Sequence, residues 1–249
     1  MVDRLRAALD RGDPAIGTWC TLPGTWSAEV LGAAGFDWVV ADLQHGAPTW
    51  ETLLPVLQAV ELGGAAPVVR VGWNDPASIM RALDLGAAGV IVPMVDDADA
   101  AVRAARACRY PPDGDRSFGP LRRRFPDVAS ANSGVLCLPM IETAAGLANA
   151  EQIAGAPGVD GVFLGPVDLA LGLGLGLDPS MRHPDVLAAV DRCVAATRAH
   201  GRVVATTASS TGHARDLIAR GVAMVTVGSD RNFVAAGAAR ELAALQNDR

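Results

Sequence analysis

The sequence contains no lysine, because all 21 of its Lys/Arg positions are arginine. A Schiff-base aldolase, a pyridoxal-phosphate aldimine and a Walker A phosphate loop each depend on a lysine amine, so all three are excluded. The glycine fingerprint of NAD-binding Rossmann domains is also missing after the first apolar run. Any catalysis must therefore proceed without a lysine amine, and we expect no PLP and no NAD.

Cysteine is scarce, and long apolar runs are missing. Cys20, Cys108, Cys137 and Cys193 show no C-x-x-C spacing, and no secretory signal opens the chain, so we expect reduced thiols in the cytoplasm. Pro, Asp or Arg interrupts every apolar run within about 18 residues, so no run is long enough to span a bilayer. The net charge of -6 argues against a surface for nucleic acid or anionic membrane. We expect a soluble protein that acts on small molecules.

Eight β-type runs alternate with segments of helical spacing, and half of the 249 residues are hydrophobic. The predicted strands are 16–20, 38–43, 67–71, 89–95, 136–141, 161–165, 203–208 and 224–229. The main helix candidates are 2–12, 49–64, 75–89, 97–108 and 183–201. Eight alternations favour an α/β fold closed as a parallel (β/α)8 TIM barrel. No linker divides the chain, so we expect residues 1–249 to form one domain.

Polar residues stand where several predicted strands end, and in a parallel barrel those ends meet at one mouth. They are Asp42, Gln44 and His45 after the second strand, Arg70 in the third, Glu142 after the fifth, and Gly165, Pro166 and Asp168 after the sixth. Two carboxylates on consecutive strands suggest a Mg²⁺ or Mn²⁺ site that a 2-oxo acid and waters would complete. Arg70 would add positive charge at the keto oxygen, and His45, oriented by Asp42, would move protons. This set predicts a metal-dependent aldolase.

Structural roles are open for the same residues. Asp42 and Asp168 would serve as helix caps, Arg70 would form an ion pair with Asp42 or Glu142, and His45 would be an ordinary polar residue. The convergence of four strand ends favours the functional interpretation.

Two connections and several tryptophans stay open. Segment 109–134 is long and rich in Pro, Gly and Arg, and we interpret its run Arg122–Arg124 as a solvated loop rather than a lid. Segment 172–176 alternates glycine with leucine, without a clear role. Trp19, Trp26, Trp50 and Trp73 would either line a pocket for an aldehyde or pack in the core or an interface.

Several motifs, in this order, resemble the HpcH/HpaI family of class II pyruvate aldolases. They are FDWVVADLQHG, PVVRV, ALDLGAAGVIVPMVDDADAAV, RYPPDGDRSFG, MIET, GVDGVFLGPVDL and the tail VTVGSDRNFVAAG. The resemblance implies a barrel of the phosphoenolpyruvate/pyruvate type with a divalent metal (Mg²⁺, Mn²⁺ or Co²⁺). It implies reversible cleavage of 4-hydroxy-2-oxo acids to pyruvate, or hydroxypyruvate, and an aldehyde. It also implies a homo-oligomer, a hexamer built as a trimer of dimers, with the last helix packed on a neighbouring subunit.

Carried onto this sequence, the resemblance implies that Glu142 and Asp168 bind the metal. It also implies that His45 with Asp42 handles protons and that Arg70 stabilises the enolate. These are the residues that their positions at the strand ends indicate independently.

The resemblance assigns further residues to substrate binding. The segment Gly165, Pro166, Val167 and Asp168 would hold the pyruvate carboxylate at the start of a helix. Gln44 stands where many relatives have Glu, which removes a charge beside the metal. Asp84 matches a family position near the active site that reaches a neighbouring subunit, although its place at the end of a helix also allows a purely structural role.

Two other functions stay open at this point. One is a lyase of CoA thioesters, of the citrate-lyase or malyl-CoA-lyase type, which shares the barrel and the metal. The other is a barrel that binds a 2-oxo acid without catalysis.

Overall fold

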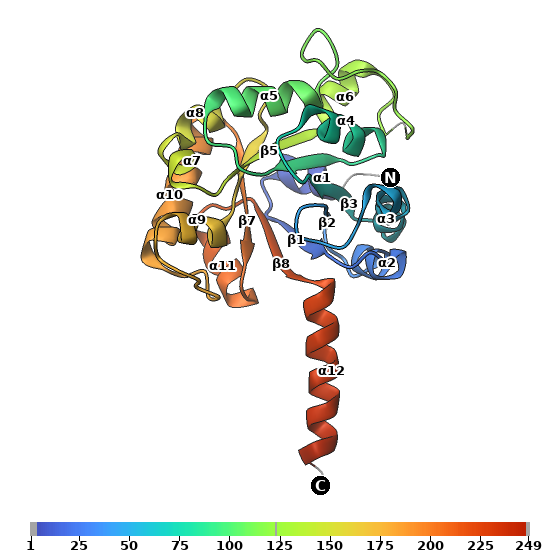
Figure 1. Ribbon diagram of the computed structural model, residues 1–249, viewed down its shortest axis with the longest axis vertical. Coiled ribbons are helices and arrows are strands. Elements are labelled where there is room, and N and C mark those ends of the chain that lie inside the picture. Colours follow the sequence, from blue (N-terminus) through green and yellow to red (C-terminus); the bar gives the residue numbers. More distant parts are fainter. Residues whose placement is uncertain (1–3, 123, 248–249) are drawn as a thin grey trace.

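A computed structural model describes residues 4–122 and 124–247. Its eight strands form a closed parallel barrel in chain order, with β8 pairing back to β1 (Figure 1). The strands are β1 (Ala15–Cys20), β2 (Trp38–Asp42), β3 (Ala66–Arg70), β4 (Gly89–Val92), β5 (Leu136–Ile141), β6 (Gly161–Leu164), β7 (Val203–Ala208) and β8 (Met224–Ser229). The predicted (β/α)8 barrel is confirmed.

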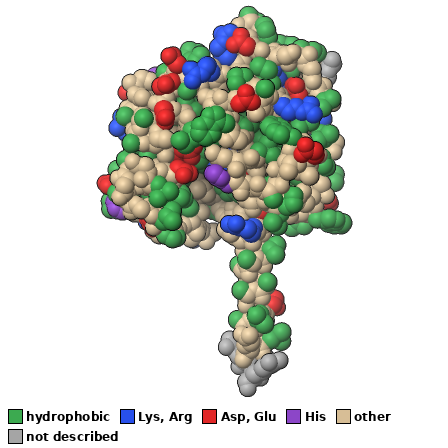
Figure 2. Space-filling model, in the orientation of Figure 1, with side chains coloured by type: hydrophobic (Ala, Val, Ile, Leu, Met, Phe, Trp, Pro, Cys, Tyr) green, Lys and Arg blue, Asp and Glu red, His purple; other side chains and the backbone are tan. Residues whose placement is uncertain are grey.

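Helices surround this barrel. They are α1 (Arg4–Arg11), α2 (Thr25–Ala33), α3 (Trp50–Gly63), α4 (Pro76–Asp84), α5 (Ala98–Cys108), α6 (Val128–Gly134), α7 (Ala144–Ala148), α8 (Ala150–Gly155), α9 (Pro166–Gly172), α10 (Pro184–Ala199), α11 (Thr211–Ala219) and α12 (Asp230–Asn247). Their starts follow ordinary cap chemistry: Asp75 accepts from the Ser78 N–H, and Asp97 accepts from the Ala100 N–H. Unlike the other helices, α12 projects away from the barrel and carries apolar side chains along its length (Figure 2).

Strand limits agree closely with the apolar runs in the sequence. Strands β5, β7 and β8 occupy the predicted residues, whereas β4 ends at Val92, three residues earlier than expected. Pro93 has no N–H to continue the ladder, and Met94 takes a left-handed φ of 55°. The chain therefore turns away from the sheet before it reaches Val95.

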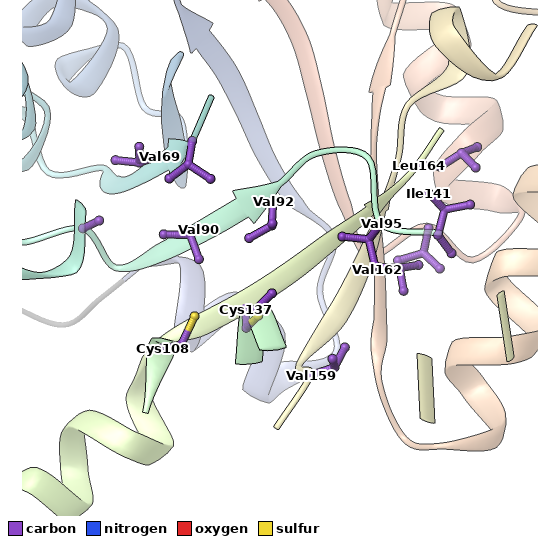
Figure 3. Packing of buried hydrophobic residues seen from close by; sticks show 14 of the residues in the cluster. Val69, Val90, Val92, Val95, Cys108, Cys137, Ile141, Val159, Val162 and Leu164 are labelled. Carbon is purple, nitrogen blue, oxygen red and sulfur yellow. The ribbon is translucent and has the colours of Figure 1, made fainter. Parts of the chain in front are cut away.

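Two buried layers arise from the alternation of side chains along the strands. Val69, Val90, Cys137 and Val162 point outward and pack beneath the helices (Figure 3). Their sequence neighbours Val68, Ile91, Leu138 and Phe163 fill the interior of the barrel. Both faces of each strand are thus buried, which is why the strands read as almost wholly apolar.

The inward-facing row of side chains on the strands includes the charged residues of the candidate site. On β2 this row passes through Trp38 and Val40, and on β3 through Ala66 and Val68. Two residues further along each row come Asp42 and Arg70. On β5, Leu138 and Met140 point inward in the same way, and the next inward position is Glu142. The strand period therefore aims three charged side chains at the mouth of the barrel.

The long connection between α5 and β5 lies at the other end of the barrel. It leaves the carboxyl end of a helix and leads into a strand, so it belongs to the face of the strands' amino ends. Within it, Arg122 and Arg124 both pair with Glu61 of α3. The interpretation of these two arginines as a solvated loop is wrong, because α3 supplies a carboxylate that the sequence pattern did not reveal; residue 123 lies outside the described residues.

In the described ranges, no helix combines the length and apolar character of a membrane span.

Candidate active site

Asp42 and Arg70 form a buried, bidentate ion pair at the mouth. They are register partners on β2 and β3, so their side chains leave the sheet side by side. Arg70 Nε lies 2.8 Å from Asp42 Oδ1, and Arg70 Nη2 lies 2.7 Å from Asp42 Oδ2. Asp42 is 2% exposed and Arg70 is 9% exposed. Such paired geometry fixes the guanidinium in one orientation.

Trp19 covers the face of the same guanidinium. The carbon at the centre of the Arg70 guanidinium lies 4.5 Å from the centroid of the indole ring. The ring is itself held, because Trp19 Nε1 donates to Thr226 Oγ1 at 2.8 Å and its edge meets the Phe163 ring. Among the described residues, Arg70 Nη1 has no hydrogen-bond partner, so this nitrogen is available to a ligand.

His45 lies on the rim and is exposed. The expectation that Asp42 orients its imidazole ring is wrong for this structure. Asp42 Oδ1 instead accepts from the backbone N–H groups of Gln44, at 3.1 Å, and His45, at 3.3 Å. Asp42 thus contacts the backbone that carries His45 and makes no hydrogen bond to the imidazole ring. In the part of the chain that the structure describes, the imidazole has no hydrogen-bond partner.

Glu142 is a buried carboxylate of the site and, like Asp42, is 2% exposed. Its Oε1 accepts from the Met94 N–H at 2.7 Å, a bond that the left-handed backbone of Met94 makes possible. Burial raises the pKa of Glu142, and the nearby Asp168 carboxylate raises it further, against the opposing effects of the Met94 N–H and Arg70. A buried carboxylate with a second carboxylate nearby provides the surroundings in which a bound cation is favourable.

The donor set fits a divalent metal. Glu142 Oε2 faces Gly165, where a Cβ atom would come within 2.8 Å of it, so only glycine leaves room there. Asp168 is exposed in the first turn of α9. No group of three or more His, Cys, Asp or Glu suited to a metal occurs within residues 4–122 and 124–247. A hard ion held by two carboxylates, with substrate and water as its other ligands, agrees with this arrangement.

The start of α9 also offers hydrogen-bond donors. Pro166 occupies the first position and is buried, while Val167 and Asp168 are exposed. The N–H groups of Val167 and Asp168 find no acceptor among the described residues. This first turn therefore presents free donors for an anion such as a carboxylate.

A cavity of about 410 Å³ opens beside the Asp42–Arg70 pair. Trp19, His45 and the ends of β7 and β8 line one part of it, and Pro179 and Met181 of the segment after α9 line another. Ser209 Oγ donates to the Ser180 carbonyl at 2.7 Å, which ties this segment to the end of β7. The volume lies within the range of about 300–1,000 Å³ that small-ligand sites usually have.

Two other residues predicted for the site have different surroundings. Gln44 is partly buried beside Asp42, and its Oε1 is a buried acceptor without a partner among the described residues. Asp84 does not join the mouth within this chain. It ends α4, where it accepts from Arg116 Nη2 at 2.8 Å, and helices of this fold end near the opposite face of the barrel.

Some residues of the site carry no signal in the sequence. Trp19 is one of four equivalent-looking tryptophans, and Trp26 and Trp73 are exposed away from the lining of this cavity. Met94 contributes only a backbone N–H. Arg231 and Asn232, at the start of α12, also line the cavity. Their place directly after the last predicted strand was the one available sign, because residues at such ends face the mouth.

Barrel and residues together define a carbon–carbon lyase of the class II aldolase type. The family model described as HpcH/HpaI aldolase/citrate lyase matches residues 16–236. A 4-hydroxy-2-oxo-heptane-1,7-dioate aldolase of Shigella boydii serotype 4 is 40% identical over 245 residues, which are 96% of this chain and 93% of the relative. The chain belongs to the HpcH/HpaI aldolase/citrate lyase family.

Solved structures agree with this assignment. An HpcH/HpaI aldolase/citrate lyase family protein from Burkholderia cenocepacia J2315 gives a TM-score of 0.89 at 33% identity, covering 98% of this chain and 100% of that one. The citrate synthase SbnG gives the same TM-score at 30% identity, covering 98% of each chain. The barrel is thus shared between aldolases and an enzyme named for carbon–carbon bond formation.

Proposed function

We propose that this protein cleaves and forms 4-hydroxy-2-oxo acids, with pyruvate, or hydroxypyruvate, as one product and an aldehyde as the other. The observation that carries the proposal is the inward row of Asp42, Arg70 and Glu142, which sets a fixed cation near the buried Glu142 carboxylate and its exposed neighbour Asp168. A 2-oxo acid would place its keto oxygen at Arg70 and its carboxylate at the first turn of α9. The name of the Shigella relative supports the same reaction.

In the cleavage direction, the C4 hydroxyl of the substrate loses its proton and the C3–C4 bond breaks. The electron pair passes into the enolate of pyruvate, the aldehyde departs, and a proton added at C3 completes pyruvate. Arg70 places Nη1 at the oxygen where negative charge develops, and Asp42 and Trp19 hold it there before the reaction begins. His45, on the cavity wall, is the group for moving protons.

Glu142 and Asp168 would hold the divalent ion, with Mg²⁺, Mn²⁺ or Co²⁺ as the candidates. Such an ion, when bound, supplies Lewis-acid polarisation of the keto group. The buried Glu142 keeps Oε2 toward this position while the Met94 N–H occupies Oε1.

Exchange of the pyruvate methyl protons in D₂O tests the proposal, since it requires only the enolate and no aldehyde. We expect exchange, followed by NMR, when Mg²⁺ or Mn²⁺ is added, and its loss in Glu142→Ala. Glu151→Ala, on the exposed face of α8, serves as the matched control. A wild-type protein that exchanges nothing with any divalent ion would contradict the proposal, and malyl-CoA cleavage faster than that of free hydroxy-oxo acids would redirect it.

We further propose a homo-oligomer, a hexamer arranged as a trimer of dimers. Helix α12 projects from the barrel (Figure 1), its residues Phe233, Val234, Leu242 and Leu245 are exposed, and a neighbouring subunit would bury them. In such an assembly Asp84 would reach the site of a neighbour. Light scattering of the intact protein is expected to give a hexamer, and a monomer at all concentrations would contradict it.

The four cysteines are free thiols, in agreement with the cytoplasm as the compartment.

A further inference from the structure

The cavity contains a second arginine whose charge the reaction does not use. Four of its lining residues are ionisable: Asp42, His45, Arg70 and Arg231. Asp42 and Arg70 neutralise each other in their bidentate pair. Arg231 has no ion pair with any residue in the described part of the chain. The cavity is therefore net positive in a protein whose net charge is -6.

The position of Arg231 is fixed from its backbone. Its neighbour Asp230 is 3% exposed and accepts from the N–H of Thr21 at 2.9 Å and of Leu22 at 3.0 Å. These contacts join the start of α12 to the end of β1, two residues beyond Trp19. The same Asp230 carboxylate also accepts from the Arg231 N–H at 2.9 Å. Asp230 is thus fully occupied by donors, and the Arg231 side chain is left to the cavity.

Arg70 and Arg231 stand at separate parts of the wall. Arg70 comes from β3 and is committed to Asp42 and the Trp19 face, whereas Arg231 follows β8. Under the proposed function Arg70 binds the 2-oxo acid end of the substrate, so the aldehyde half would extend into the cavity, whose lining includes the exposed Arg231. Asn232 and Ser209 line the cavity with it and offer polar groups.

We propose that Arg231 selects aldehydes that end in a carboxylate, an inference that rests on the proposed function. A guanidinium presents two parallel N–H groups that match the two oxygens of a carboxylate. A four-carbon semialdehyde fits this description, because retro-aldol cleavage of a 4-hydroxy-2-oxo-heptanedioate leaves C4 to C7 with a terminal carboxylate. Arg231 is thus a specificity-determining residue that leaves the chemistry at C3 and C4 to other groups.

The test compares two aldehydes of equal length in addition to pyruvate: succinic semialdehyde, which carries the carboxylate, and butanal, which does not. The readout is the ratio of their kcat/KM values. We expect wild type to favour the semialdehyde and Arg231→Gln to lower the ratio about 10-fold, the size of one lost charge-assisted hydrogen bond. Arg231→Lys should retain part of the preference, and Arg231→Glu should lower the ratio further. Arg240→Gln, an exposed arginine on the same helix, is the control that changes net charge equally.

Each other result has a defined meaning. A ratio unchanged in both Arg231→Gln and Arg231→Glu overturns the inference, as does a wild type that prefers butanal or glyceraldehyde 3-phosphate. Pyruvate exchange in D₂O is measured on the same preparations. Exchange without any effect at Arg231 removes this inference alone, whereas a wild type without exchange counts against the proposed function.

Discussion

Replacing Glu142 with glutamine should make the protein more stable than wild type without metal and less stable than wild type with metal. The introduced amide would keep an oxygen for the Met94 N–H but would carry no charge. Burial and Asp168 raise the pKa of Glu142, so the folded state binds this proton more tightly than the unfolded state does. The stabilising contribution is full below the unfolded pKa and is lost as pH rises through the folded pKa. At pH 8 with EDTA, we therefore expect Glu142→Gln to be more stable than wild type.

Metal should produce the opposite order. At a free Mn²⁺ concentration about 100 times Kd, binding adds about 2.7 kcal/mol to the free energy of unfolding. For a chain of this length, that gain raises Tm by about 5–10 °C. Glu142→Gln should lose most of this rise, while Glu151→Gln should follow wild type under both conditions. Differential scanning fluorimetry with EDTA and with Mn²⁺ measures these Tm values for each protein. Equal rises in wild type and Glu142→Gln, or a variant less stable in EDTA, would refute the reasoning.

Three further outcomes follow from the structure. Arg70→Lys loses the bidentate contact and the stacking on Trp19, so kcat should fall about 10²–10³-fold, the usual loss for one oxyanion donor; steady-state kinetics with little change would contradict it. Leu138→Ala opens a hole in the barrel interior and should cost about 2–5 kcal/mol in urea unfolding, whereas a cost below about 1 kcal/mol would mean that the interior refills. Burial lowers the pKa of His213, so its contribution to stability is present above its unfolded pKa of about 6.5 and is lost as pH falls through the folded pKa. Between pH 8 and pH 5, the free energy of unfolding should therefore decline less steeply in His213→Gln than in wild type. Identical slopes in urea unfolding would refute this prediction.

Sequence reasoning located the barrel and the charged residues at its mouth for one physical reason. A charged residue that follows a strand buried on both faces is conspicuous, and Asp42, Arg70 and Glu142 all stand in that position. The fourth strand was predicted, but its end was placed three residues too late because that end depends on the backbone of Met94, which no residue pattern indicates. Every residue except proline has a backbone N–H, so the sequence does not show that Met94 donates to Glu142.

Other features depend on partners that are distant in sequence. Trp19 was one of several candidates for the pocket, and its stacking on Arg70 follows from the closeness of β1 and β3 around the closed barrel. The pairing of Arg122 with Glu61 joins a loop to a helix 61 positions away. Arg231 escaped notice because charged residues are common in the first turn of a helix, and only the fold shows which ones face a cavity.

The single register position shared by Asp42 and Arg70 has a consequence for how this enzyme could diversify. Sheet pairing holds the half of the site that activates the donor, so a change there would disturb the whole barrel. The acceptor half that we propose would be built from Pro179, Met181, Ser209 and Arg231, which line the cavity and lie in connections or at a helix start. Substitutions in these segments can accumulate without altering the barrel. New acceptors should thus be reachable by library selection at these four positions, while the donor stays the same.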